Sequence, residues 1–278
     1  VGTAIGGSAS FGPDSSQNGL PIVGFVPACP PQSFGDRSFL TDYGLQFPLV
    51  GGSMAHGISS AGIVEELGKN GMMAFFGAAG LSPETVEKNI DRISRTLGDK
   101  PFGFNLIHSP NEPLLENAIV DLYLRRGVKL VEASAYLGMT LPLVRYRLHG
   151  IHRDQKGNIV TPNRIIAKVS RVEVATKFFS PPPEKLLQEL VSKGTITPDQ
   201  AEMAATIPMA YDLTAEADSG GHTDNRPAVT LTPTMVALRD RLQKQFGYAH
   251  PLRVGAGGGI STPLSMAAAF AMGAAYVM

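Results

Sequence analysis

The sequence predicts an α/β fold, a TIM (β/α)₈ barrel that is cut short in its eighth strand. Its length of 278 residues is usual for such a barrel. From Leu45 onwards, short apolar runs alternate with longer stretches of helical period, which is typical of a parallel sheet buried on both faces. Eight runs can be counted, and eight strands favour a closed barrel over an open sheet.

The apolar runs are predicted to be the strands of this sheet. In chain order they are predicted at Phe47–Gly52, Met72–Phe76, Phe102–Ile107, Lys129–Ala133, Ile165–Ser170, Ala210–Ala215, Leu252–Gly255 and Ala275–Met278. The last run reaches the final residue with no helix after it. A barrel without its last helix leaves part of its wall uncovered, so we expect the sequence to be a fragment of a longer polypeptide.

Helices are predicted between these strands, at 59–69, 83–97, 112–126, 141–149, 171–178, 232–246 and 261–272. Ser82 and Pro83 supply an N-cap and a proline suited to the first helical position. Thr232-Pro233 and Thr262-Pro263 repeat this signal and predict two further helix starts.

Three segments depart from the alternation. Residues 1–44 form a lead-in to the barrel at 45–278, and their first part is rich in Gly, Ser and Pro. A polar turn containing Asp154 and Gly157 predicts a small hairpin ahead of strand five. An insertion at about 180–208, with helical stretches at 184–193 and 198–206, separates strands five and six. We expect this insertion to cover the mouth of the barrel, the alternative being an extra packing element.

Composition excludes several classes of partner. Lys plus Arg and Asp plus Glu are balanced at 24 each, which gives no electrostatic footprint for nucleic acid or for an anionic membrane. The lone Cys29 permits neither an internal disulfide nor a thiolate-only metal site, and we predict no metal. No signal peptide is visible, and the apolar run from Met266 to Met278 is too short to cross a bilayer, so we expect a cytoplasmic protein. A homo-oligomer is left open.

Active sites of such barrels lie at the carboxyl ends of the strands, so the residues that follow each strand are the candidates. Gly52, Ser53 and Met54 follow the first strand, and Asn105 ends the third. Each has a structural alternative. The glycine-rich loop could be a plain turn between strand and helix, Met54 could fill a gap in the core, and Asn105 could cap a helix.

Gly257, Gly258 and Gly259 follow strand seven and precede a helix start. Glycines let a backbone approach an anion closely, and the amides at a helix start point towards it. A run of glycines is often only a flexible turn, but the loops after strands seven and eight commonly hold phosphate in barrels. We therefore predict a phosphate site here.

His222 follows Gly220 and Gly221 at the end of strand six, beside Asp218 and Asp224. A lone histidine is more often structural than catalytic, but the two glycines leave room for the plane of a ligand. We predict that His222 is catalytic or contacts the ligand.

Lys168 lies within a buried strand, and a buried lysine needs an anionic partner. It is either held in a salt bridge by Glu132 or Glu216 from neighbouring strands, or it is a cation that faces an electron-rich ligand.

The segment from Ala217 to Pro227 closely resembles the signature of the PfaD family, the trans-acting enoyl reductases of polyunsaturated fatty acid and polyketide synthases. Segments 104–110, 131–135, 166–171 and 253–260 add to the resemblance, which covers roughly residues 25–278. The wider superfamily includes nitronate monooxygenases and shares a shorter Gly-Gly-His pattern.

The resemblance implies FMN as cofactor, NADPH as electron donor, and an enoyl thioester on an acyl carrier protein domain as substrate. It places Gly52, Ser53, Met54, Asn105, Lys168, Gly220, Gly221 and Gly257–Gly259 around the flavin. His222 would then donate to the thioester oxygen or deliver a proton, and Lys168 would stabilise the reduced flavin. Nitronate oxidation in the same scaffold and a non-catalytic docking module of a synthase are the alternatives. Family members continue past strand eight with a turn that completes the phosphate site, and this sequence does not contain that turn.

Overall fold

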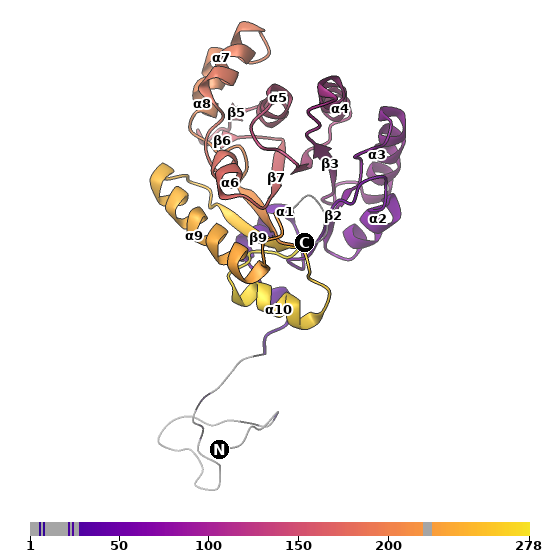
Figure 1. Ribbon diagram of the computed structural model, residues 1–278, viewed down its shortest axis with the longest axis vertical. Helices are drawn as coiled ribbons and strands as arrows, with labels where there is room; N and C mark the ends of the chain where they lie inside the picture. Colours follow the sequence, from indigo (N-terminus) through magenta and orange to yellow (C-terminus); the bar gives the residue numbers. More distant parts are fainter. Residues whose placement is uncertain (1–5, 7, 9–21, 23, 25–27, 219–223) are drawn as a thin grey trace. The chain divides into compact units, whose positions relative to one another are not determined.

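The computed structural model describes residues 6, 8, 22, 24, 28–218 and 224–278. The chain divides into two compact units, Val1–Pro30 and Pro31–Met278. Every helix and strand found among the described residues belongs to the second unit. Within that unit, helices surround a central sheet (Figure 1).

The central sheet that the described residues form has seven strands, and all neighbouring pairs within it are parallel. In spatial order they are β1 (Val50–Gly51), β2 (Met73–Phe76), β3 (Gly103–Ile107), β4 (Leu130–Ser134), β7 (Arg164–Val169), β8 (Asp212–Glu216) and β9 (Arg253–Gly257). Each overlaps a strand predicted from the sequence, although β1 is reduced to two residues.

The last residues of the chain close this sheet into a ring. Val277 forms parallel bridges with both Leu49 and Ala256. Its N–H donates to the carbonyl of Pro48 at 2.9 Å, and the N–H of Met278 donates to the carbonyl of Ala256 at 2.8 Å. The eighth strand position is therefore filled, and the predicted barrel is confirmed.

Helices follow the strands and cover the outside of the barrel (Figure 1). They are α2 (Ala61–Lys69), α3 (Pro83–Leu97), α4 (Pro113–Arg125), α5 (Leu141–Leu148), α6 (Val172–Phe178), α9 (Ala228–Phe246) and α10 (Pro263–Ala271). Ser82 and Thr262 cap α3 and α10 as predicted, and each accepts a hydrogen bond from a backbone N–H of the first turn.

The predicted helix start at Thr232-Pro233 is wrong. Helix α9 begins at Ala228, directly after Pro227, and Pro233 lies inside it. As the sixth residue of the helix, Pro233 costs it the backbone hydrogen bond to the carbonyl of Val229. Burial of Leu231 and Met235 on either side of it favours the longer helix.

The predicted hairpin is confirmed as the antiparallel pair β5 (His152–Arg153) and β6 (Ile159–Val160). The insertion contains α7 (Glu184–Ser192) and α8 (Pro198–Ala204). Gln200 of α8 donates to the carbonyl of Ile151, next to the hairpin, at 3.1 Å. Figure 1 shows α7 and α8 beside α5 and the hairpin.

The prediction that the insertion covers the barrel mouth is wrong. The insertion links α6 to β8, and a helix-to-strand connection returns to the amino ends of the strands. Thr206 and Ile207, at its end, line a cavity together with Asp212 and Arg253, the first residues of β8 and β9. Only strand-to-helix loops reach the carboxyl end, where barrel active sites lie.

An apolar cluster fills the interior of the barrel towards its amino end. The lead-in contains the 3₁₀ turn Pro31–Ser33 and an unpredicted helix, α1 (Arg37–Tyr43), from which Phe39 stacks on Tyr276 with ring centroids 4.2 Å apart. These rings pack in one cluster with side chains of the strands: Met73, Phe75, Leu130 and Ile166. The polar residues of the carboxyl end therefore lie above an apolar layer.

Gly255→Ala is expected to lower the free energy of unfolding by about 1–3 kcal/mol. A Cβ atom at Gly255 would lie 2.3 Å from the ring of Tyr276, which is fully buried and has no room to move. Urea denaturation measures the loss. Gly62→Ala in α2 is the matched control, because a Cβ there meets only Ser60 at 3.7 Å. An equal loss in both variants would contradict the packing argument.

Candidate active site

A layer of polar side chains crosses the barrel interior at its carboxyl end. Lys168 of β7 places its Nζ 3.1 Å from Oε1 of Glu132 on β4 and 3.5 Å from Oε1 of Glu216 on β8. The salt bridge predicted for Lys168 is therefore present to both carboxylates. This leaves the ammonium fixed in the centre of the layer.

Glu132 organises three of the predicted site residues. It is fully buried, and its carboxylate accepts hydrogen bonds from the Ser53 N–H at 3.0 Å and the Ser53 hydroxyl at 2.6 Å. The amide Nδ2 of Asn105 donates to the Glu132 carbonyl at 3.3 Å and to Ser134 Oγ at 3.1 Å. Ser53 and Lys168 thus meet at the carboxylate of Glu132, and Asn105 at its backbone carbonyl, although the sequence indicated Glu132 only as a salt-bridge partner.

The two carboxylates keep Lys168 charged. Burial acts to lower the pKa of Lys168, but Glu132 and Glu216 outweigh it and raise the pKa above its ordinary value of 10.5. A protonated lysine at this depth is a permanent cation, which suits it to contact a ligand group that gains negative charge.

The loop after β1 is shaped by close backbone contacts. Ser59 Oγ donates to the carbonyl of Gly52 at 2.6 Å and accepts from the N–H of Met54 at 2.8 Å. A Cβ at Gly52 would lie 2.9 Å from Cγ of Met278, so a larger residue there would require the Met278 side chain to shift. Met54 is 50% exposed, which rules out a core-filling role and leaves it on the rim.

The Gly257–Gly259 loop lies at the carboxyl end of β9, the face on which it was predicted. Gly258 and Gly259 have φ angles of 89° and 69°, which favour glycine. Within the described ranges, the N–H groups of Gly258, Gly259 and Ile260 have no hydrogen-bond acceptor. Helix α10 starts three residues further on at Pro263, after its N-cap Thr262. These amides ahead of a helix start form a site that an anion can occupy.

Gly220, Gly221 and His222 lie outside the described residues. The residues on either side of them are held at the carboxyl end of the barrel. The N–H of Asp218 donates to the carbonyl of Arg226 at 2.9 Å. Asp224 accepts a hydrogen bond from Ser170 Oγ, at the end of β7, at 2.8 Å.

A cavity of about 720 Å³ lies among the loops that follow β1 to β4. Asn105 connects its wall to the polar layer, and Leu81, Leu106, Leu115 and Ile119 make much of it apolar. This volume is in the range of ligand sites.

Two histidines to which the sequence pattern assigns no role also line this cavity. Nδ1 of His108 lies 3.1 Å from Oε2 of Glu116, which is buried and also accepts hydrogen bonds from Tyr136 and Thr140. The backbone of His56 and of Ala135, both in the cavity wall, has positive φ, a costly conformation that clusters at functional sites. His108 lies within the 104–110 segment, which resembles the PfaD family, and this resemblance is the one feature of the sequence that points to His108.

Residues 37–278 match the family model described as nitronate monooxygenase. The chain is 47% identical to one of the polyunsaturated fatty acid synthase proteins of Thraustochytrium sp., over 91% of its own length and 17% of that protein. It is 46% identical to the polyketide biosynthesis protein PksE of Bacillus subtilis over 89% of its length and 32% of that protein. The chain therefore spans less than a third of either relative.

Among solved structures, the enoyl reductase domain of MlnA from Bacillus amyloliquefaciens superposes with a TM-score of 0.86 at 42% identity, covering 90% of this chain and 56% of that one. FabK from Thermotoga maritima superposes with a TM-score of 0.55 at 22% identity, over 86% of this chain and 60% of that one, which establishes a shared fold.

Proposed function

The chain belongs to the nitronate monooxygenase family of flavin-type oxidoreductases, and we propose that within it the chain is the barrel of an enoyl reductase. The substrate would be a 2-enoyl thioester on an acyl carrier protein, made in fatty acid or polyketide biosynthesis. One observation carries this proposal: the barrel matches an enoyl reductase domain of a macrolactin biosynthesis cluster over 90% of the chain at 42% identity.

The residues present fit FMN. The amides of Gly258 and Gly259, in the Gly257–Gly259 loop, and of Ile260 suit its phosphate, and Asn105 and Lys168 provide donors for its ring. When bound, FMN supplies hydride transfer from NADPH to the β-carbon of the substrate. The fixed cation of Lys168 would stabilise the negative charge of the reduced ring, while Ser53 and Glu132 hold the ammonium in place.

His222 would donate a hydrogen bond to the thioester oxygen, or a proton to the α-carbon, as negative charge develops there. The apolar wall of the cavity at the carboxyl end would take the acyl chain and exclude water. His108 lies in the same wall, and its hydrogen bond to Glu116 orients the ring, so it is a second candidate proton donor.

Nitronate oxidation by O₂ is the second candidate, because the family model carries that description. A decisive assay mixes the protein with FMN, NADPH and a crotonyl-carrier thioester and detects the saturated product by mass spectrometry. A parallel reaction replaces NADPH and thioester with a nitronate and oxygen. Saturated product in the first supports the proposal, and turnover in the second alone favours the alternative. Failure to acquire the visible absorption of flavin indicates a non-catalytic docking module.

A further inference from the structure

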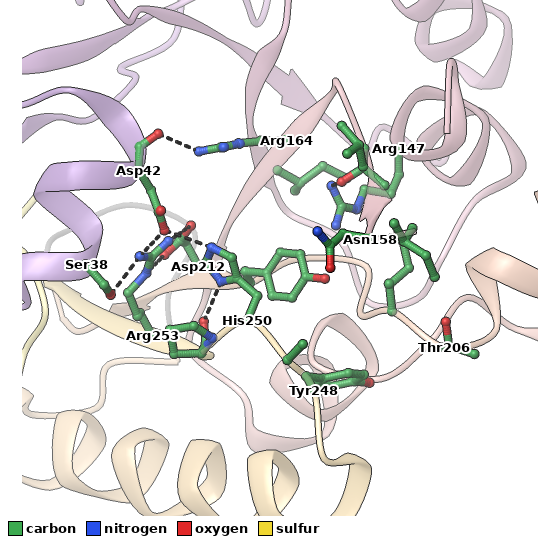
Figure 2. Close-up of a pocket in the computed structure, with 18 of the residues that line it drawn as sticks. Ser38, Asp42, Arg147, Asn158, Arg164, Thr206, Asp212, Tyr248, His250 and Arg253 are labelled. Carbon is green, nitrogen blue, oxygen red and sulfur yellow. Dashed lines mark hydrogen bonds and ion pairs between the residues drawn. The ribbon is translucent and has the colours of Figure 1, made fainter. Parts of the chain in front are cut away.

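A second cavity, of about 670 Å³, lies at the amino end of the barrel, opposite the proposed flavin site. The first residues of three strands, Arg164, Asp212 and Arg253, form part of its wall (Figure 2). The hairpin contributes residues 158–160 and the insertion contributes Thr206 and Ile207. The lead-in contributes Ser38, Asp42 and Tyr43, so all three departures from the regular barrel pattern line the same cavity, whose volume suits a small molecule.

The two aspartates in this wall already have cationic partners. Asp212 forms a bidentate pair with Arg253, with distances of 2.6 Å and 3.1 Å. Asp42 accepts from the same guanidinium at 2.6 Å, and its Oδ2 lies 2.8 Å from Nε2 of His250 (Figure 2). Neither carboxylate is left to neutralise another arginine.

Arg147 has no carboxylate partner within the described part of the chain. It is 1% exposed, and it donates only to neutral oxygens, those of Thr161 at 2.7 Å, Asn163 at 2.8 Å and Pro208 at 3.3 Å. Its guanidinium also lies over the ring of Tyr211, 5.3 Å from the centroid. Burial lowers the pKa of Arg147, but an arginine stays charged in proteins, so an uncompensated cation faces this cavity.

Arg164 is a second arginine of this wall that has no carboxylate partner in the described part of the chain. It donates to the backbone carbonyl of Asp42 at 2.8 Å and lies over the ring of Tyr43, 5.0 Å from the centroid. No carboxylate among the described residues lies within ion-pair distance of it. The four lining arginines, which include Arg153, exceed the two aspartates by two charges when His250 is neutral.

A buried charge without a partner, such as that of Arg147, is unfavourable. An anion that enters this cavity therefore gains the attraction of Arg147 and of the half-buried Arg164. We propose that the cavity binds a small organic anion that bears phosphate or carboxylate groups, with Arg147 and Arg164 as its counter-charges. Guanidinium groups recognise both kinds of oxyanion. Arg164 can do so through hydrogen bonds, whereas Arg147, whose N–H groups already donate to Thr161, Asn163 and Pro208, acts through its charge. The rings of Tyr211 and Tyr248 and the side chain of Ile207 provide walls for the organic body.

Isothermal titration calorimetry of the full chain with pyrophosphate and with citrate, at constant ionic strength, tests the proposal. At least one of the two anions should bind saturably with one site per chain. Arg164→Gln should weaken that binding by about tenfold or more, since it removes one charged partner. Arg95→Gln makes the same charge change on the exposed face of α3, outside the cavity, and should leave the affinity unchanged.

Arg147→Gln would remove the hydrogen bonds to Thr161, Asn163 and Pro208 and could unfold the chain, so a different second variant is used. Thr206→Glu places a carboxylate in the cavity wall at an exposed position, so it should leave folding intact and abolish anion binding. Tighter binding of pyrophosphate assigns the ligand to phosphate compounds, and tighter binding of citrate assigns it to polycarboxylates. The proposal is overturned if neither anion binds the parent chain, or if Arg164→Gln and Thr206→Glu bind as tightly as the parent.

Discussion

Lys168→Met is expected to lower the free energy of unfolding by about 3–5 kcal/mol, because it leaves Glu132 buried without its cation. Equilibrium urea denaturation measures this loss. Glu132→Gln combined with Lys168→Met should recover part of it, since the double variant also removes the charge of the fully buried Glu132 and leaves only that of Glu216. Lys69→Met, which breaks an exposed ion pair with Glu66, is the control and should change little.

The pH dependence of the same variant checks the sign of the effect. The folded-state pKa of Lys168 is raised, so its contribution is complete below the ordinary value of 10.5 and is lost as the pH rises through the higher folded-state value. The difference in stability between the parent chain and Lys168→Met should therefore be constant near neutral pH and shrink in strongly alkaline buffer. A constant difference at every pH would show that the lysine acts through packing of its aliphatic stem alone.

The barrel was predictable because its signal is local. Each parallel strand is buried on both faces and reads as an apolar run, and Ser82 and Thr262 mark helix starts within a few residues of sequence. Helix α1 was not predicted, because its seven residues form too few turns to establish a helical period. The placement of the insertion was predicted wrongly because its length does not indicate which end of the barrel it covers. Its position between a helix and a strand does, and that position places it at the amino end.

Part of the site was also predictable, because some of its residues are marked by local sequence position. Residues at strand ends can be found by position, which identified Ser53, Asn105 and Lys168 before their meeting at Glu132 was known. Contacts between residues far apart in the sequence are not indicated by any local pattern. Arg253 meets Asp42 across 211 positions, and nothing in the sequence pairs them or shows that Arg147 is left without a carboxylate among the described residues.

His222→Ala is expected to retain FMN and to lose most enoyl reduction. His222 follows Gly220 and Gly221, whose missing Cβ atoms leave room for a planar ring, so its imidazole is proposed to reach the substrate above that ring. Loss of an oxyanion-type donor costs about 10²–10³ in rate and loss of a general acid about 10²–10⁴, so the overall rate does not separate the two roles. The two half-reactions, followed by stopped-flow absorbance of the flavin, give the sharper test.

In His222→Ala, NADPH should bleach the flavin at a near-normal rate, while reoxidation by the enoyl thioester should slow by at least about tenfold. His108→Ala is the matched comparison, because the His108 ring lies in the wall of the cavity at the carboxyl end of the barrel, oriented by Glu116. If His222 stabilises the thioester oxygen and His108 delivers the proton, both variants slow reoxidation, but only His108→Ala changes the size of the solvent isotope effect, because the proton must then come from water. Unchanged reoxidation in His222→Ala would make His222 a structural histidine and leave His108 as the candidate acid.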